Sequence, residues 1–149
     1  MTAPSNPQPL RRVLFICLGN TCRSPMAAAL VNHFLGHAWQ AASGGARPGS
    51  QVSPLAVEAM AELGIDIRDH QPQAADAFRE EPWDKVILLS DQLGPVALGW
   101  PQVQERLVLP FPDPYQAVGD RSQRLAVYRQ VRDAMRARLL PLLAEEESG

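Results

Sequence analysis

The amino-acid sequence predicts a three-layer α/β sandwich built around a four-stranded parallel sheet. Short apolar runs rich in β-favouring residues alternate along the chain with stretches whose apolar residues recur at helical spacing. This alternation is typical of a parallel sheet covered on both faces. The chain has 149 residues, of which 46% are apolar and 20% are charged, a composition that suits one globular domain. We therefore expect a single domain over residues 10–144, with disordered tails at residues 1–9 and 145–149.

Four short runs are predicted to be strands because each is apolar and is bounded by turn-forming or charged residues. In chain order they cover residues 13–16, 38–43, 85–90 and 106–109. The first carries no charge, which is typical of a strand buried inside a parallel sheet. The second is only moderately apolar and leads into a predicted glycine-rich loop over residues 43–49.

Apolar residues at helical spacing predict the elements that connect these strands. In chain order the predicted helices cover residues 24–37, 53–63, 74–78 and 122–143. Pro25 suits the first turn of the first helix, where its missing N–H costs nothing, and Gly64 ends the second helix. Pro141 is expected to kink the last helix or to end it early. Residues 91–100 contain two glycines and a proline, so we expect a loop or a broken helix there.

The nine residues from Cys17 to Pro25 connect the first strand to the first helix. Such a loop points backbone N–H groups and the positive end of the helix dipole at one place, and it therefore favours an anion. The same field and the nearby Arg23 guanidinium favour the thiolate form of Cys17. Arg23 is the sixth residue after Cys17, a spacing that lets its planar group grip two oxygens of a tetrahedral oxyanion. The loop is predicted to bind a phosphate-like dianion and to attack it through sulfur.

Three further residues of this loop suit the same chemistry. Gly19 permits backbone conformations that a side chain forbids. Asn20 can hydrogen-bond across a strained loop, and the Ser24 hydroxyl can donate to the sulfur of Cys17. The alternative is a buried, structural Cys17 beside a helix cap, but that reading leaves the glycine, the arginine and the Ser-Pro pair without a purpose.

A zinc site is the second alternative for the cysteines. Cys17, Cys22, His33 and His37 superficially match a two-Cys, two-His pattern. The helix predicted over residues 24–37 is about 20 Å long at about 1.5 Å per residue, and it places both histidines far from the thiols. We therefore expect no metal and no other cofactor.

Composition argues against several other classes of protein. A net charge of −2 does not suit a nucleic-acid partner. No apolar run reaches membrane-spanning length, and residues 1–12 lack a signal-peptide core. Two cysteines so close together do not make the disulfide framework of a secreted protein. We expect a cytoplasmic protein that binds neither nucleic acid nor membranes.

Residues 17–25 read C-x-G-N-x-C-R-S-P and resemble the signature loop of the low-molecular-weight protein tyrosine phosphatases, which carry it near the N-terminus. The resemblance extends to about residue 143 and implies that family's fold in a single catalytic domain. It also implies hydrolysis of phosphomonoesters, such as phosphotyrosine and other aryl phosphates, through a phosphocysteine on Cys17, with Arg23 stabilising the phosphoryl oxygens. The implied partners are phosphorylated proteins or small phosphomonoesters. The implied substrate-binding residues are Leu18, Gly19, Asn20, Thr21, Cys22 and Ser24.

Such a mechanism also needs a proton for the leaving oxygen and later a base for water. In the family this group is an aspartate in a D-P-Y context near the last helix, which matches Asp113, Pro114 and Tyr115. From the local sequence alone, Asp113 could equally belong to an ordinary turn between prolines. Ser43, in Ala-Ser-Gly, matches a family serine that supports the asparagine of the loop, so the resemblance implies a contact between Ser43 and Asn20.

Other segments are more similar to the arsenate reductases built on the same fold, which also begin with a nucleophilic cysteine in C-x5-R. This similarity lies in residues 48–72, 111–114 and 128–133. The thioredoxin-coupled reductases pass oxidation to two further cysteines near the end of the third strand, and this chain has none there. One alternative is therefore an arsenate reductase that uses an external small thiol. Another is a non-enzymatic module that binds oxyanions such as phosphate or arsenate, or senses oxidants through Cys17 and Cys22.

Overall fold

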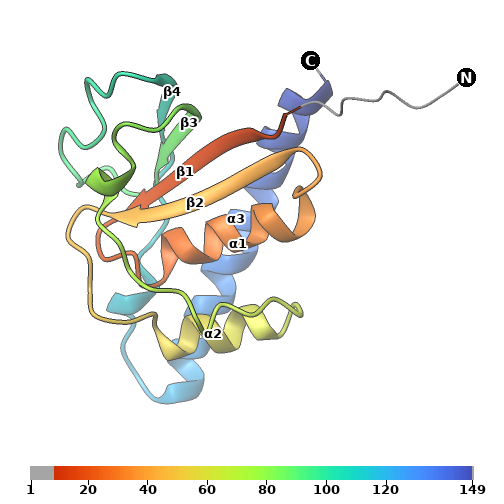
Figure 1. The fold of residues 1–149 in the computed structure, drawn as a ribbon. Coiled ribbons are helices and arrows are strands. Elements are labelled where there is room, and N and C mark those ends of the chain that lie inside the picture. Colours follow the sequence, from red (N-terminus) through yellow and green to blue (C-terminus); the bar gives the residue numbers. More distant parts are fainter. Residues whose placement is uncertain (1–8, 149) are drawn as a thin grey trace, which may run out of the picture.

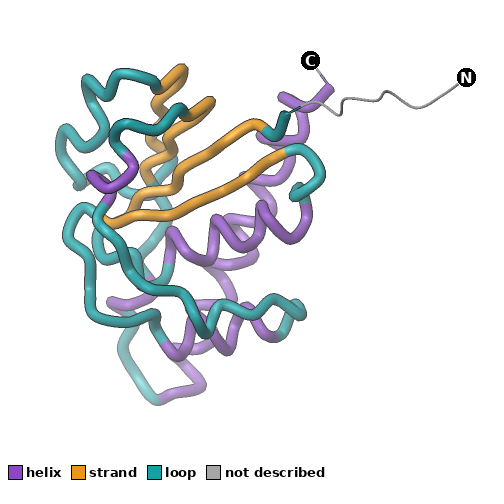
Figure 2. The backbone as a smooth tube through the Cα atoms, viewed as in Figure 1, coloured by secondary structure: helices purple, strands orange, loops and turns teal. Residues whose placement is uncertain are grey.

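The structure is a computed structural model that describes residues 9–148. Within that range four strands form one parallel sheet in the order β2-β1-β3-β4, joined by three α-helices and two short 3₁₀ helices (Figures 1 and 2). The elements are β1 (Arg11–Cys17), α1 (Arg23–Phe34), β2 (Trp39–Gly45), α2 (Pro54–Ala61), η1 (Ala75–Phe78), β3 (Trp83–Leu88), β4 (Val103–Val108), η2 (Pro114–Gln116) and α3 (Arg121–Ser148). The predicted α/β fold with a four-stranded parallel sheet is confirmed.

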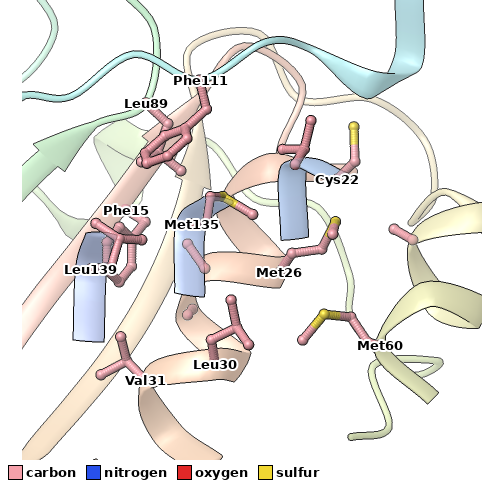
Figure 3. Packing of buried hydrophobic residues seen from close by; sticks show 14 of the residues in the cluster. Phe15, Cys22, Met26, Leu30, Val31, Met60, Leu89, Phe111, Met135 and Leu139 are labelled. Atoms are coloured by element: carbon pink, nitrogen blue, oxygen red, sulfur yellow. The ribbon is translucent and has the colours of Figure 1, made fainter. Parts of the chain in front are cut away.

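Alternate residues of β1 belong to two separate cores on opposite faces of the sheet. Val13 and Phe15 pack in the larger core, together with residues of α1, α2 and α3 (Figure 3). Leu14 and Ile16 pack in the smaller core, which η1 and the irregular segment 89–102 complete. All four side chains are fully buried. The third layer of the sandwich is therefore a short 3₁₀ helix and irregular chain rather than a set of α-helices.

Strand β2 continues through Gly45, two residues beyond the predicted end of the strand and into the segment where the sequence predicts a loop. A Cβ on Gly44 would lie 2.8 Å from the Cα of Ala75 in η1, and one on Gly45 would lie 2.9 Å from the carbonyl oxygen of Leu18. Both distances are too short for a real side chain. The glycines therefore serve the close approach of the strand to η1 and to the signature loop, rather than a turn.

Helix α1 ends at Phe34, three residues before the predicted end. Glycine is a poor helix former, and a Cβ on Gly36 would lie 2.4 Å from the carbonyl oxygen of Asn32, so the chain turns there over residues 36–38. His33 stays in the last helical turn, whereas His37 lies beyond the helix. Residues 9–148 contain no group of three or more His, Cys, Asp or Glu side chains placed to share a metal ion.

Helix α3 is longer than the sequence predicts and contains Pro141 without ending there. Pro141 is exposed, and the helix continues through residues 145–148, where a tail is predicted. Three of these residues are glutamates, which are good helix formers. Of the two predicted tails, residues 1–8 and residue 149 lie outside the described residues. No helix in the described part of the chain is long and apolar enough to cross a membrane.

The last two strands begin earlier than predicted, because Trp83 already pairs with Val103 in the sheet. Their carboxyl ends lie at the same edge of the sheet as the end of β1. After β4 the chain stays at this edge, where the Phe111 N–H donates to the carbonyl oxygen of Leu89 at 3.0 Å. This path brings Asp113 to the loop that follows Cys17.

Candidate active site

Two hydrogen-bonding groups of the signature loop contact the sulfur of Cys17. Cys17 is the last residue of β1, and Arg23 is the first residue of α1, so the five residues between them turn the chain around the sulfur. The backbone N–H of Asn20 donates to Sγ at 3.3 Å, and the Ser24 hydroxyl lies 2.9 Å from it. Ser24 accepts from Asn20 Nδ2 at 2.8 Å, and its own hydrogen has two acceptors within reach, Sγ at 2.9 Å and the carbonyl oxygen of Gly44 at 3.4 Å. Donors in these positions stabilise negative charge on the sulfur.

Asn20 links the signature loop to residues 70–73, about fifty residues later in the chain, and these contacts stabilise the conformation of the loop. Its φ is 56°, in the left-handed region, and it is fully buried. Its Oδ1 accepts from the backbone N–H of Gln73 at 2.9 Å, and its carbonyl oxygen lies 2.9 Å from Nε2 of His70. Ser43, the residue that the resemblance pairs with Asn20, is buried in β2. The described side-chain partners of Asn20 are Ser24 and the backbone of Gln73 instead.

Arg23 is buried, and its guanidinium is only partly satisfied. Nη1 donates to the carbonyl oxygen of Phe111 at 3.1 Å and more weakly to that of Leu89 at 3.4 Å. Nη2 lies 3.6 Å from Oδ2 of Asp113. Among the described residues, Arg23 Nε is the one buried side-chain nitrogen or oxygen without a hydrogen-bond partner. Burying a donor without an acceptor costs free energy, and an oxyanion bound against Arg23 would supply the acceptor.

The carboxylate of Asp113 is held by three neighbours. Oδ1 accepts from the backbone N–H of Tyr115 at 3.0 Å and from the thiol of Cys22 at 3.7 Å, and Oδ2 faces Arg23. Burial, the Asp113 carboxylate and the neighbouring Cys17 raise the pKa of Cys22 to about 12, because each disfavours a thiolate. Cys22 is therefore a neutral donor to Asp113 at neutral pH.

A cavity of about 450 Å³ brings these groups together. Cys17 and Arg23 line it from the signature loop, and Asp113 and Tyr115 line it from the chain after β4. From the chain after β2, Arg47 and residues 49–54 line it. Residues 47–54 contain no aromatic side chain. Tyr115, which is 67% exposed, is the aromatic residue among the lining residues.

The family model of the low molecular weight phosphotyrosine protein phosphatases matches residues 12–147. The chain belongs to this family. The matched range contains the whole signature loop, with Cys17 and Arg23, and also Asp113. The predicted relationship to the low-molecular-weight phosphatases is therefore confirmed.

Within the low-molecular-weight phosphatase family, the chain is similar to curated arsenate reductases. It is 35% identical to an arsenate reductase of Halalkalibacterium halodurans and 32% identical to one of Bacillus subtilis. Both matches span 127 residues, 85% of this chain and 91% of the relative. Among solved structures, an arsenate reductase in the phosphate binding state has a TM-score of 0.78 at 27% identity, over 91% of this chain and 98% of that one. A low molecular weight protein tyrosine phosphatase from T. tengcongensis has a TM-score of 0.73 at 27% identity, over 91% and 99%.

Some of the predicted substrate-binding residues of this phosphatase-family loop line the cavity, and the others contact the Cys17 sulfur from the buried side of the loop. Four of them line the cavity: Leu18, Gly19, Thr21 and Cys22. The other two, Asn20 and Ser24, are fully buried and contact the sulfur of Cys17.

Sequence reasoning missed a hydroxyl pair that joins α2 to α3 beside the loop. Ser53 Oγ donates to Tyr128 Oη at 2.9 Å, and the backbone N–H of Ser53 donates to the carbonyl oxygen of Thr21 at 2.9 Å. Burial raises the pKa of Tyr128 to about 12, so its hydroxyl stays protonated. The sequence places Tyr128 on the apolar face of the last helix, and nothing local indicates that its hydroxyl faces Ser53. His70 matches a loop histidine that is frequent in the family but lies outside the predicted catalytic residues, because its sequence context favours a structural role; in the structure it contacts the carbonyl oxygen of Asn20.

Proposed function

We propose that this chain is an arsenate reductase that depends on an external thiol. Its site suits a tetrahedral oxyanion, because donors face the Cys17 sulfur and Arg23 Nε has no partner in the described part of the chain. Arsenate and phosphate share this shape and charge. The choice of arsenate rests on one observation. The chain is 35% and 32% identical, over 85% of its length, to two relatives named arsenate reductases.

In the proposed reaction the Cys17 sulfur attacks arsenic and forms an S–As bond. One As–O bond breaks, and its oxygen leaves as water with a proton from Asp113, which enters this step as the protonated carboxyl group and leaves it as the carboxylate. An external thiolate then attacks the Cys17 sulfur. The S–As bond breaks with its electron pair on arsenic, so As(V) becomes As(III) and departs as arsenite. A second external thiol attacks the mixed disulfide and restores Cys17. Two thiols are oxidised to one disulfide for each arsenate reduced.

The reducing thiol is assigned to an outside molecule because the chain contains only two cysteines. Cys22 is the internal candidate, but burial and the neighbouring Asp113 raise its pKa to about 12, so that it is a thiol rather than a thiolate at pH 8. Attack on a sulfur requires the thiolate. The segment after β3, residues 90–93, lines a cavity beside Arg23 and Asp113 but contains no cysteine.

Hydrolysis of phosphomonoesters is the second candidate, with phosphorylated proteins or small phosphomonoesters as substrates. The observation that favours it is the position of Asp113, whose carboxylate lines the same cavity as Cys17 and lies 3.6 Å from Arg23. A carboxyl group there could protonate an ester oxygen that leaves a phosphocysteine on Cys17, and could later activate water. A module that only binds oxyanions or senses oxidants needs no such acid.

Two assays on the same reduced preparation test the assignment. One aliquot receives arsenate and a small thiol, and a second aliquot receives p-nitrophenyl phosphate. The proposal predicts many arsenite molecules formed per chain and only feeble release of nitrophenol, with Cys17→Ser as the blank in both assays. Fast ester hydrolysis without arsenite would move the assignment to the phosphatase. Binding of vanadate without either reaction would move it to a binding module.

A further inference from the structure

The cavity at Cys17 is larger than one oxyanion needs. Its volume of about 450 Å³ falls in the range of roughly 300–1,000 Å³ typical of pockets that enclose organic ligands. An oxyanion that contacts the Cys17 sulfur and Arg23 Nε occupies only the part of the cavity next to those two residues. The space between residues 47–54 and Tyr115 is therefore available to a second molecule during the reaction.

Arg47 lines this second part of the cavity, and its backbone is tied to the signature loop. The Arg47 N–H donates to the carbonyl oxygen of Leu18 at 2.8 Å, and the neighbouring Ala46 N–H donates to that of Cys17 at 3.0 Å. Two residues later, the Gly49 N–H donates to the carbonyl oxygen of Gly19 at 2.8 Å. These bonds fix the Cα of Arg47 relative to the reacting sulfur, although its side chain is exposed.

The charges in the cavity leave the Arg47 guanidinium without a counter-ion. Asp113 supplies the one carboxylate among the lining residues, and it already faces Arg23. Arg47 forms no ion pair with any residue in the described range 9–148. An oxyanion on Cys17 takes up the donors of Arg23, whereas the Arg47 guanidinium keeps its own donors without a partner among the described residues. A second molecule that carries an anionic group can accept from these donors.

We propose that Arg47 binds the carboxylate of the external thiol, so that the preferred reductant is a small thiol that carries a carboxylate. This inference rests on the proposed thiol-dependent reaction and adds the chemical class of the second substrate. An ion pair with Arg47 would hold the thiol in the cavity that contains Cys17, and this raises its effective concentration at the sulfur that it attacks. The guanidinium suits a carboxylate because it can donate two parallel hydrogen bonds.

The test compares two thiols of similar size, 3-mercaptopropionate and 2-mercaptoethanol, which differ in a carboxylate. The measured quantity is the ratio of their kcat/KM values for arsenite formation, since this ratio cancels effects common to both thiols. Arg47→Ala is expected to lower the ratio about five-fold, the size of a partly exposed ion pair. Arg47→Lys should restore much of it, and high salt should reduce the wild-type ratio by screening.

Arg124→Ala is the matched control. Arg124 is also exposed and forms no ion pair with the described residues, but it lines an adjacent cavity of about 450 Å³ that does not contain Cys17. The proposal predicts a wild-type ratio for Arg124→Ala. Equal ratios in wild type and Arg47→Ala would overturn the proposal, and so would an equal loss in Arg124→Ala.

A second readout works without arsenate and separates this proposal from the proposed function. The Cys17 thiolate attacks a small disulfide, forms a mixed disulfide and releases one thiolate, and mass spectrometry follows the added mass. Arg47→Ala should slow the reaction with 3,3′-dithiodipropionate more than the reaction with hydroxyethyl disulfide. If no thiol supports arsenite formation, the reductase assignment fails, and these two rates still decide the role of Arg47. Equal slowing of both reactions would overturn that role.

Discussion

Cys17→Ser is expected to abolish arsenite formation, with a loss in kcat on the order of 10⁴-fold or more. Serine cannot form the disulfide through which the electrons reach arsenic, and its hydroxyl is a far weaker nucleophile than a thiolate. The oxyanion should still bind, because Arg23, the loop N–H groups and Ser24 are unchanged. Arsenite production measures the first effect, and calorimetric titration with phosphate or vanadate measures the second.

Cys22→Ser is the matched control for this substitution. Serine at position 22 keeps a neutral donor toward Asp113, so activity within a few-fold of wild type is expected. An active Cys17→Ser variant alongside an inactive Cys22→Ser variant would reverse the roles of the two cysteines.

Asp113→Asn is expected to lower kcat/KM for arsenate by roughly 10²–10⁴-fold, the usual contribution of a general acid. The amide cannot give a proton to the oxygen that leaves arsenic, whereas it keeps an acceptor for the backbone N–H of Tyr115. Any residual hydrolysis of aryl phosphates should also depend on a proton from Asp113. The variant should lose more activity on phenyl phosphate than on p-nitrophenyl phosphate, because the poorer leaving group has the greater need of a proton.

Asp91→Asn controls for the loss of a negative charge near Arg23. Asp91 lines the neighbouring cavity beside Arg23 and Asp113 but not the cavity that contains Cys17, so nearly full activity is expected. An Asp113→Asn enzyme with wild-type kcat/KM and an unchanged leaving-group dependence would remove Asp113 from the role of acid.

The parts of this protein that are predictable from sequence are those set by neighbouring residues. The buried strand, the loop after Cys17 and the helix that begins near Pro25 are contiguous, and their residue types determine the conformation together. The order of the elements also places Asp113 at the same edge of the sheet as Cys17, because the carboxyl ends of parallel strands share one edge. The fold and the two halves of the candidate site follow from these local features.

The parts that are not predictable depend on contacts between distant segments. Asn20 is held in its left-handed conformation by Gln73 and His70, about fifty residues later, and only the folded chain brings them together. Gly44 and Gly45 look like turn residues, but they extend a strand because η1 and the loop approach it closely. Proline disfavours the interior of a helix, yet Pro141 lies inside the long helix α3, at a position exposed to solvent.

The most direct test of the central claim is a single-turnover reaction without any external thiol. Wild-type protein is reduced, freed of reductant and mixed with excess arsenate at pH 8, and arsenite is measured before and after a small thiol is added. Because the pKa of Cys22 is raised to about 12 and the chain has no third cysteine, no arsenite above the Cys17→Ser blank is expected until the thiol arrives. Repeated turnover should then follow. One arsenite per chain before the addition, together with a Cys17–Cys22 disulfide, would contradict the requirement for an external thiol.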